Sequence, residues 1–166
     1  SQPTLSAQVR KLEEYLGVPL VERQPKRVAL TATGEKIVER ARRLLQEAQA
    51  ARRRDRARRS LYQGLLELSQ GEWQTAEDTV TRSARDSEAP VVHFLVAARA
   101  ADLQGERARC EDWLAKALDS TAGDRAPVLI TQAEIFLRHK QSQAALTVLQ
   151  QLETSGEHNT RALVLL

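Results

Sequence analysis

The feature that most constrains the fold of this chain is an internal repeat in its second half. A turn residue recurs every 34 residues, and a small residue follows each turn five positions later. A glycine permits the tight turn between two antiparallel helices, and the small residue lets the second helix approach the first closely. The repeat therefore predicts stacked helix pairs. The turn positions are Gly71, Gly105 and His139, and the small-residue positions are Ala76, Cys110 and Ala144.

Three helix pairs follow from this spacing. A period of 34 residues is that of tetratricopeptide repeats, whose stacked helix pairs share one continuous core. Pro90 and Pro127 open the first helices of the second and third pairs, because proline is tolerated in a first turn. The predicted helices are 56–70 and 73–86, 90–104 and 106–120, and 125–138 and 142–154, with another beginning in 160–166. The predicted core is Leu65, Leu66, Val80, Phe94, Leu95, Ala98, Leu103, Trp113, Leu114, Ala117, Leu129, Ile135, Phe136, Val148, Leu149 and Leu152.

The first fifty residues follow a different pattern. A helix is expected from an N-cap at Ser1 to a stop at Gly17, with an apolar stripe at helical spacing. Two short extended stretches, 20–23 and 27–30, then form a basic β-ribbon around Pro25. Thr31 caps a second helix, over residues 31–50, with one apolar face. The stripe of the first helix is Leu5, Val9, Leu12 and Leu16, and the face of the second is Ile37, Val38, Ala41, Leu44, Leu45 and Ala48.

This order of elements resembles the back half of a winged helix-turn-helix. The stretch SQPTLSAQVRKLEEYLG at 1–17 is similar to the recognition helix of LysR-type transcriptional regulators, with the peroxide-sensing OxyR branch as the nearest variety. VPLVER at 18–23 and VALTATG at 28–34 are similar to that family's wing and linker helix. The family's two preceding helices and its effector domain are not in the chain. A competing interpretation is therefore a helix-and-ribbon fragment without intact DNA reading.

The LysR resemblance implies where DNA would be contacted. The N-terminal turn of the first helix would enter the major groove of double-stranded DNA. The helix at 31–50 would form a homodimer. The implied base-facing residues are Gln2, Pro3, Thr4, Ser6 and Gln8, and the implied phosphate or minor-groove residues are Arg10, Arg23 and Arg27.

Charge divides the chain at a run of arginines. Residues 1–59 hold 15 Lys/Arg against 7 Asp/Glu, whereas residues 60–166 hold 10 against 15. This asymmetry suggests two kinds of partner. Three interpretations of the run stay open: a nucleic-acid contact, a membrane-proximal basic segment, or a solvated junction inside one helix from about residue 31 to about residue 70. The run is Arg52, Arg53, Arg54, Arg56, Arg58 and Arg59.

The second half also resembles a known family. RARRSLYQGLLELSQGEW at 56–73 and APVVHFLVAARAA at 89–101 are similar to the HemY family, inner-membrane tetratricopeptide proteins linked to haem biosynthesis. The likeness is expected over about 52–166. It implies a scaffold and no catalyst, and the membrane helices that precede the arginine run in that family are not in this chain.

Catalytic and metal-binding patterns are not found. His93, His139 and His158 are too far apart for a local metal site, and no phosphate loop or nucleophile elbow occurs. Cys110 occupies a small-residue slot, which favours a buried structural thiol. We expect no enzyme activity, metal or cofactor. The candidates for a peptide-binding groove on the first helices of the repeats are Tyr62, Arg99 and Asp102.

The fold expected is all-α with one short β-ribbon near residues 20–30: a partial winged helix at 1–50, a basic junction at 51–59 and tetratricopeptide-like repeats at 60–166. The expected function is a non-enzymatic protein-interaction scaffold fused to a partial DNA-binding segment. The alternatives are a DNA-binding regulator fragment that dimerises through 31–50, and an engineered chimera without evolved function. The single cysteine and the lack of a signal peptide favour the cytoplasm, with the inner-membrane face possible for the parent of the repeat half. The polar start without methionine suggests a longer parent sequence.

Overall fold

A computed structural model describes residues 4–24, 27–121 and 123–154 of the 166-residue chain. Within these residues the fold is helical apart from one two-stranded antiparallel sheet, which confirms the expected class. The chain divides into two compact units, Ser1–Ala51 and Arg52–Leu166.

The first unit begins with helix α1 (Leu5–Leu16). Thr4, which precedes it, has an extended backbone and is its N-cap residue. Because Thr4 is extended, α1 starts at Leu5, later than the sequence suggested. The expected cap at Ser1 lies outside the described residues. Gly17 ends α1 in the left-handed conformation, with φ of 70°, as predicted, and donates its N–H to the carbonyl of Glu13.

The β-ribbon forms as expected, from β1 (Val21–Gln24) and β2 (Arg27–Leu30), with Val21 opposite Leu30. The carboxylate of Glu13 fastens α1 to it. Its Oε1 accepts hydrogen bonds from the backbone N–H of Leu20 at 2.7 Å and of Val21 at 3.0 Å. A carboxylate that accepts two backbone donors satisfies N–H groups that would otherwise lack a partner at the start of the strand.

Gly34 is required where the ribbon meets the next helix. A Cβ atom at this position would lie 2.2 Å from the carbonyl oxygen of Leu20. The Thr31 hydroxyl donates to the Pro19 carbonyl at 2.8 Å and accepts from the Gly34 N–H at 3.0 Å. Thr31 therefore caps the helix, as expected, and glycine leaves room for the strand to pass.

Helix α2 (Ala32–Gln70) is continuous over 39 residues. Its sequence is rich in alanine, leucine, glutamine, glutamate and arginine, all favourable in helices. Arg59 and Asp55 form an ion pair one turn apart at 2.6 Å, and Arg43 pairs with Glu39 in the same way. The arginine run is thus part of one long helix, which confirms the third of the three interpretations as a description of its structure.

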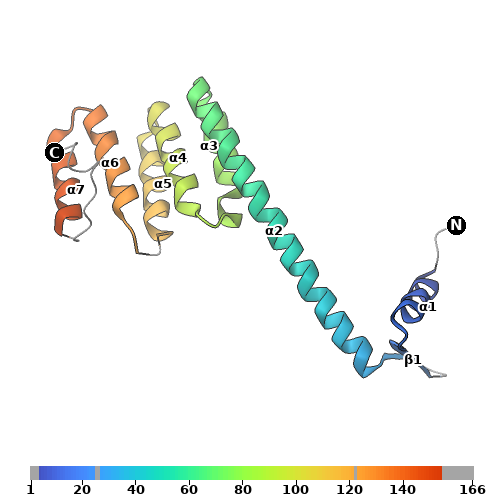
Figure 1. The fold of residues 1–166 in the computed structure, drawn as a ribbon. Coiled ribbons are helices and arrows are strands. Elements are labelled where there is room, and N and C mark those ends of the chain that lie inside the picture. The colour runs from blue at the N-terminus through green and yellow to red at the C-terminus, as the bar shows by residue number, and fades with distance from the viewer. Residues whose placement is uncertain (1–3, 25–26, 122, 155–166) are drawn as a thin grey trace. The chain divides into compact units, whose positions relative to one another are not determined.

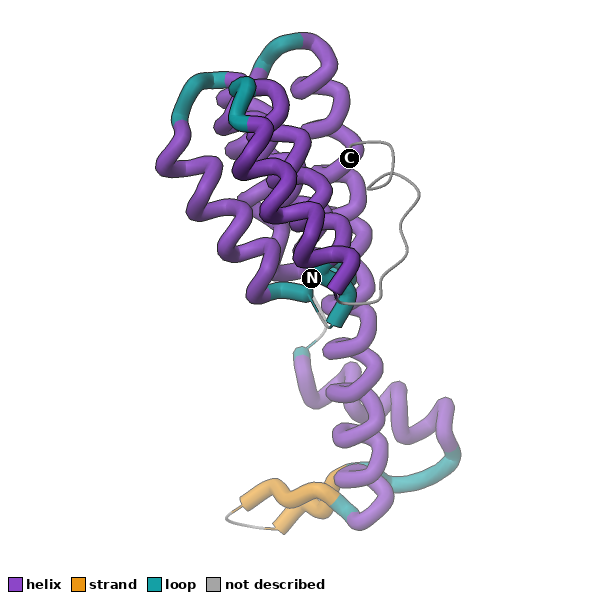
Figure 2. Tube along the Cα trace, turned by 90° about the vertical axis from the view of Figure 1, so that its left-hand side faces the viewer, coloured by secondary structure: helices purple, strands orange, loops and turns teal. Residues whose placement is uncertain are grey.

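The second unit is a stack of helices (Figures 1 and 2). The part of α2 within this unit packs on α3 (Trp73–Ser83), which is followed by a short 3-10 turn, η1 (Ala84–Asp86). Next come α4 (Pro90–Leu103) with α5 (Arg107–Asp119), and α6 (Ala126–Arg138) with α7 (Ser142–Thr154). These bounds agree with the predicted helices to within a few residues, except that the helix expected to reach residue 86 ends at Ser83. The helix expected at 160–166 lies outside the described residues.

The turns show where the 34-residue period fails. Gly71 and Gly105 have φ of 84° and 78°, as expected. In the third pair the left-handed residue is Lys140, with φ of 59°, and not His139. The buried small residue is likewise one position late, because Ala145 is buried and Ala144 only partly so. In the third pair the left-handed residue and the buried small residue therefore both lie one position later than the 34-residue period predicts.

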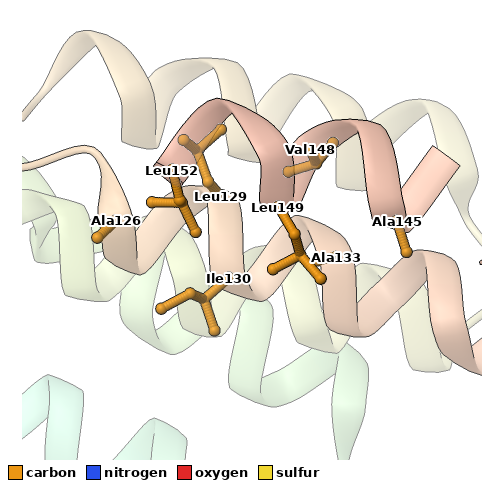
Figure 3. Close-up of a cluster of buried hydrophobic side chains, with 8 residues drawn as sticks. All are labelled: Ala126, Leu129, Ile130, Ala133, Ala145, Val148, Leu149 and Leu152. Atoms are coloured by element: carbon orange, nitrogen blue, oxygen red, sulfur yellow. The ribbon is translucent and has the colours of Figure 1, made fainter. Parts of the chain in front are cut away.

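The buried apolar side chains form three separate clusters. Trp113 packs against two of them and so joins the second pair to the first. Three residues predicted for the core are exposed: Leu65 by 42%, Leu66 by 56% and Leu103 by 37%. The cluster between α6 and α7, shown in Figure 3, consists of Ala126, Leu129, Ile130, Ala133, Ala145, Val148, Leu149 and Leu152.

Candidate functional site

The second unit carries a pocket of about 370 Å³ on the first helices of its three pairs, hereafter the A-helix groove. Its walls are mostly apolar, and two of the lining side chains are large apolar groups left partly exposed, Leu65 at 42% and Val92 at 39%. Apolar clefts with few polar groups are typical of binding sites. The lining residues are Leu65 from α2, Val92, Leu95, Val96 and Arg99 from α4, and Pro127, Ile130 and Thr131 from α6.

Arg99 lines this groove, and its guanidinium is already engaged. Its Nη2 donates to Oε2 of Glu134 at 2.7 Å, which links α4 to α6. The Arg99 side chain is 38% exposed and the Glu134 side chain 16%. Tyr62 lies on α2, three residues before Leu65, and is 61% exposed. Residues three apart are neighbours on a helix surface, so Tyr62 borders the groove without being among its lining residues.

Asp102, the third residue predicted for the groove, lies elsewhere. Its side chain is 5% exposed, and its two oxygens accept hydrogen bonds from Arg138 and His139, each at 2.6 Å. Both partners end α6 or follow it, whereas Asp102 is near the end of α4. Asp102 therefore joins the second helix pair to the third.

A second pocket, of about 340 Å³, lies beside Asp102, between α5 and α6. Cys110 lines it but is only 4% exposed. Burial raises the pKa of the Cys110 thiol to about 11, with the Asp102 and Glu111 carboxylates acting in the same direction. A thiol that stays protonated is a poor nucleophile. Cys110 thus has the structural surroundings that the sequence favoured.

A buried carboxylate that the sequence did not reveal joins the first pair to the second. Glu77 on α3 is 4% exposed. Its Oε1 accepts from the Trp113 indole N–H and its Oε2 from the Gln104 amide, both at 2.8 Å. Arg109 lies 3.8 Å from Oε2. Charge and hydrogen bonds together satisfy a group that burial alone would strongly disfavour.

His93 is fully buried between α3 and α4. Its Nδ1 lies 2.9 Å from the carbonyl oxygen of Val80, and its Nε2 has no hydrogen-bond partner. Desolvation lowers the pKa of His93, and the bond to Val80 opposes this only in part. In the described part of the chain no three His, Cys, Asp or Glu side chains gather into a metal-binding group.

The candidate DNA-contacting residues lie in the first unit. Thr4, Ser6, Gln8 and Arg10 are exposed. Arg23 lies in β1, opposite Val28, and Arg27 opens β2, while Gln2 and Pro3 lie outside the described residues. None of the residues of α1 is buried, and its apolar stripe is open, with Leu5 exposed by 77%.

None of the helices described in the structure has the length and apolar character needed to cross a membrane.

Comparison with known proteins gives two matches, one at the start of the chain and one in its middle. Residues 1–35 match the lysR family of bacterial regulatory helix-turn-helix proteins, and residues 28–105 match the HemY protein N-terminus. Both resemblances expected from the sequence are confirmed. The HemY match begins earlier than the expected residue 52, overlaps the lysR match, and ends well before residue 166.

The relatives fall into the same two groups. Protein HemY of Escherichia coli K12 is 37% identical over 94 residues, which are 57% of this chain and 24% of that protein. The hydrogen peroxide-inducible genes activator of Pectobacterium carotovorum is 55% identical over 47 residues, 28% of this chain and 16% of that protein. The Hca operon transcriptional activator HcaR of E. coli is 48% identical over 56 residues, 34% and 19% respectively. The chain thus spans a quarter or less of these relatives, and no solved structure matches it.

Proposed function

We propose that the chain is a non-enzymatic helical-repeat scaffold that holds a peptide segment of another protein in the A-helix groove. The observation that carries this proposal is the apolar floor that three helices leave partly exposed, with Leu65 and Val92 at its edge. Stacked helix pairs commonly present such concave surfaces to partners. The groove is built on packed helices, which keep its shape before a partner arrives.

The buried polar groups of the same unit support a structural interpretation. Glu77 and Asp102 bind side chains of the neighbouring helix pair, and His93 binds a backbone carbonyl. A catalytic acid or base must reach a substrate, whereas the side chains of Glu77 and Asp102 are each 5% exposed and are held by their partners. We therefore assign the unit to binding. A cytoplasmic location is part of the same proposal.

Selection from a random peptide library displayed on phage tests the scaffold role. Peptides selected on the chain should bind Leu65→Glu at least about tenfold more weakly, because a carboxylate would be placed on the apolar floor. Leu66→Glu is the matched control, since Leu66 is a more exposed leucine on the same helix that does not line the groove. Equal weakening by both variants, or the absence of any selected peptide, would contradict the proposal.

A second candidate function is DNA reading by the first unit, favoured by the lysR-family match at residues 1–35. In this proposal the start of α1 enters the major groove, with Ser6, Gln8 and Arg10 toward the duplex. Two chains would pair through the first half of α2, where Leu44 and Leu45 are exposed by 56% and 62%.

Selection from a pool of random DNA duplexes tests this second function. The chain should enrich a short sequence, and Gln8→Ala should lose that preference, whereas Arg10→Ala should weaken binding to all sequences and reduce its salt dependence. Binding without any enriched sequence would contradict sequence-specific reading.

The two matches also support a fused origin, because different families match residues 1–35 and residues 28–105. The fusion is either natural or engineered, and an engineered chimera would have no evolved function. The reading frame upstream of Ser1 in the parent gene would distinguish these origins. Intact remaining helices of a lysR-type domain upstream would favour a natural regulator fusion.

A further inference from the structure

We propose that the segment bound in the A-helix groove is acidic and amphipathic, with apolar side chains for the floor and carboxylates for arginines at one end. This inference rests on the proposed peptide-binding function and specifies its partner. It is carried by three observations: the side of α2 that continues from the groove, the charges that remain unpaired there, and the starts of α4 and α6.

Two residues of the arginine run, Arg54 and Arg58, lie on the face of α2 that borders the groove. Arg58, Tyr62 and Leu65 are spaced by four and three residues, which places them on one side of a helix. Arg58 therefore lies two turns, about 10 Å, before Leu65 along the axis. Arg54 is one turn earlier still and pairs with Glu88 at 3.4 Å. Glu88 lies just before α4, so this end of α2 is beside the start of α4.

The charges at this end of the groove favour an anionic partner. Arg58 is exposed and has no ion pair among the described residues. Two acids at this end are already paired, Glu88 with Arg54 and Asp55 with Arg59. A carboxylate brought by a partner could therefore pair with the guanidinium of Arg58.

The first turns of α4 and α6 add to this positive end. Neither N-cap residue, Ala89 or Arg125, caps its helix with a side-chain hydrogen bond. Helix N-termini carry a partial positive charge, which favours carboxylates. At α6 the Asp124 carboxylate already accepts the N–H of Ala126. Arg125 is itself an exposed cation. The apolar floor begins directly beyond these turns, at Val92 and Pro127.

The two parts of the groove have different effects on binding. The floor excludes charge and supplies affinity through burial of apolar area. Exposed ion pairs supply little affinity each, but they steer association and reject partners of the wrong sign. The expected partner therefore has apolar residues at one end of a short segment and Asp or Glu at the other.

A peptide-library selection on the full chain, from which peptides that also bind the Leu65→Glu variant are removed, tests this inference. The retained peptides should be enriched in Asp and Glu next to apolar residues. Arg58→Glu should weaken a selected acidic peptide by about fivefold. Arg56→Glu is the matched control, because residues two apart on a helix face opposite sides and Arg56 is likewise exposed without an ion pair among the described residues.

The outcomes separate the two proposals. If no peptide survives depletion on Leu65→Glu, the peptide-binding function itself fails. If peptides survive without enrichment of acidic residues, or if Arg56→Glu weakens them as much as Arg58→Glu, only the acidic partner is overturned. The acidic partner would also be overturned by salt-sensitive binding of random duplex DNA or of phosphatidylglycerol vesicles. In that case both arginine variants would lose the binding equally, and a selected peptide would not displace the DNA or vesicles. That result would assign the arginines to a polyanion surface.

Discussion

The indole N–H of Trp113 donates a 2.8 Å hydrogen bond to the buried carboxylate of Glu77, 36 residues earlier in the chain. The same indole stacks on Phe94, with ring centroids 5.9 Å apart, and lies beneath the ammonium group of Lys116. Trp113 therefore joins three helices and satisfies one of the few carboxylates that the fold buries. Its apolar contacts and its hydrogen bond can be removed separately.

Trp113→Phe should lower the free energy of unfolding by about 1–3 kcal/mol. Phenylalanine preserves most of the stacking on Phe94 but leaves Glu77 Oε1 buried without its donor, and an unsatisfied buried acceptor costs this much. Urea denaturation followed by circular dichroism measures the loss. Trp73→Phe is the control, because Trp73 is 38% exposed and its ring nitrogen makes no hydrogen bond to another described residue. A Trp113→Phe chain as stable as the Trp73→Phe chain would contradict the assigned role.

Gly64→Ala should destabilise the contact between α2 and α3. A Cβ at Gly64 would lie 2.2 Å from Cγ1 of Val80, which is fully buried, and overpacking of this kind costs typically about 1–3 kcal/mol. Alanine is otherwise the better helix residue. Val80→Ala alone also destabilises, by leaving a cavity.

The double variant Gly64→Ala/Val80→Ala provides the control for this prediction. Its decrease in the free energy of unfolding should be clearly smaller than the sum of the decreases in the two single variants. Removing Cγ1 of Val80 vacates the space that the new methyl group needs. Strictly additive losses in urea denaturation would show that the two positions do not compete for one space.

The free energy of unfolding should fall as the pH drops, because His93 is buried in its neutral form. Burial lowers the pKa of His93 below its ordinary value of 6.5, so the unfolded chain binds the proton first. The stability contributed by neutral His93 is thus present above pH 6.5 and is lost as the pH falls toward the lowered pKa. His93→Gln should remove this component, seen as a smaller difference between urea midpoints at pH 7.5 and 5.5. A His93→Gln chain with an unchanged difference between the two midpoints would contradict this assignment.

The Cys110 thiol should react slowly while the chain is folded. Its 4% exposure and its pKa of about 11 keep it covered and protonated at pH 8. Labelling with a chromogenic disulfide reagent should therefore be at least about a hundredfold slower in buffer than in concentrated urea, since only the small thiolate fraction of an already covered group can attack. Equal rates in the two solvents would show that the thiol is open in the folded state.

Most helix bounds could be predicted because they depend on local signals. Gly71 and Gly105 adopt the left-handed turns that their spacing predicted. The same period was wrong by one residue in the third pair, where Lys140 takes the left-handed position without being glycine. A non-glycine turn residue leaves a weaker signal in the sequence, since the strain is tolerated through surrounding packing.

The buried polar contacts could not be predicted from the period. Glu77 and Glu111 occupy equivalent repeat positions, 34 residues apart. Glu77 is buried beneath Trp113, whereas the side chain of Glu111 is 64% exposed and pairs with Arg107. The difference arises from which neighbour reaches each carboxylate, and that depends on the three-dimensional stack. Repeat position predicted Tyr62, Arg99 and Asp102 for the groove. Arg99 lines the groove and Tyr62 lies one turn from it, whereas Asp102 binds Arg138 away from it.

Asp102 also determines how the stack is expected to come apart. Its bonds to Arg138 and His139 join residues on different helix pairs, so their energy belongs to the interface and not to either pair alone. In a linear array, strong interfaces raise the cooperativity with which neighbours open. Loss of the last pair would leave the Asp102 carboxylate without its donors. Amide protons of α4 and α6 should therefore exchange with solvent in one shared opening event and not pair by pair.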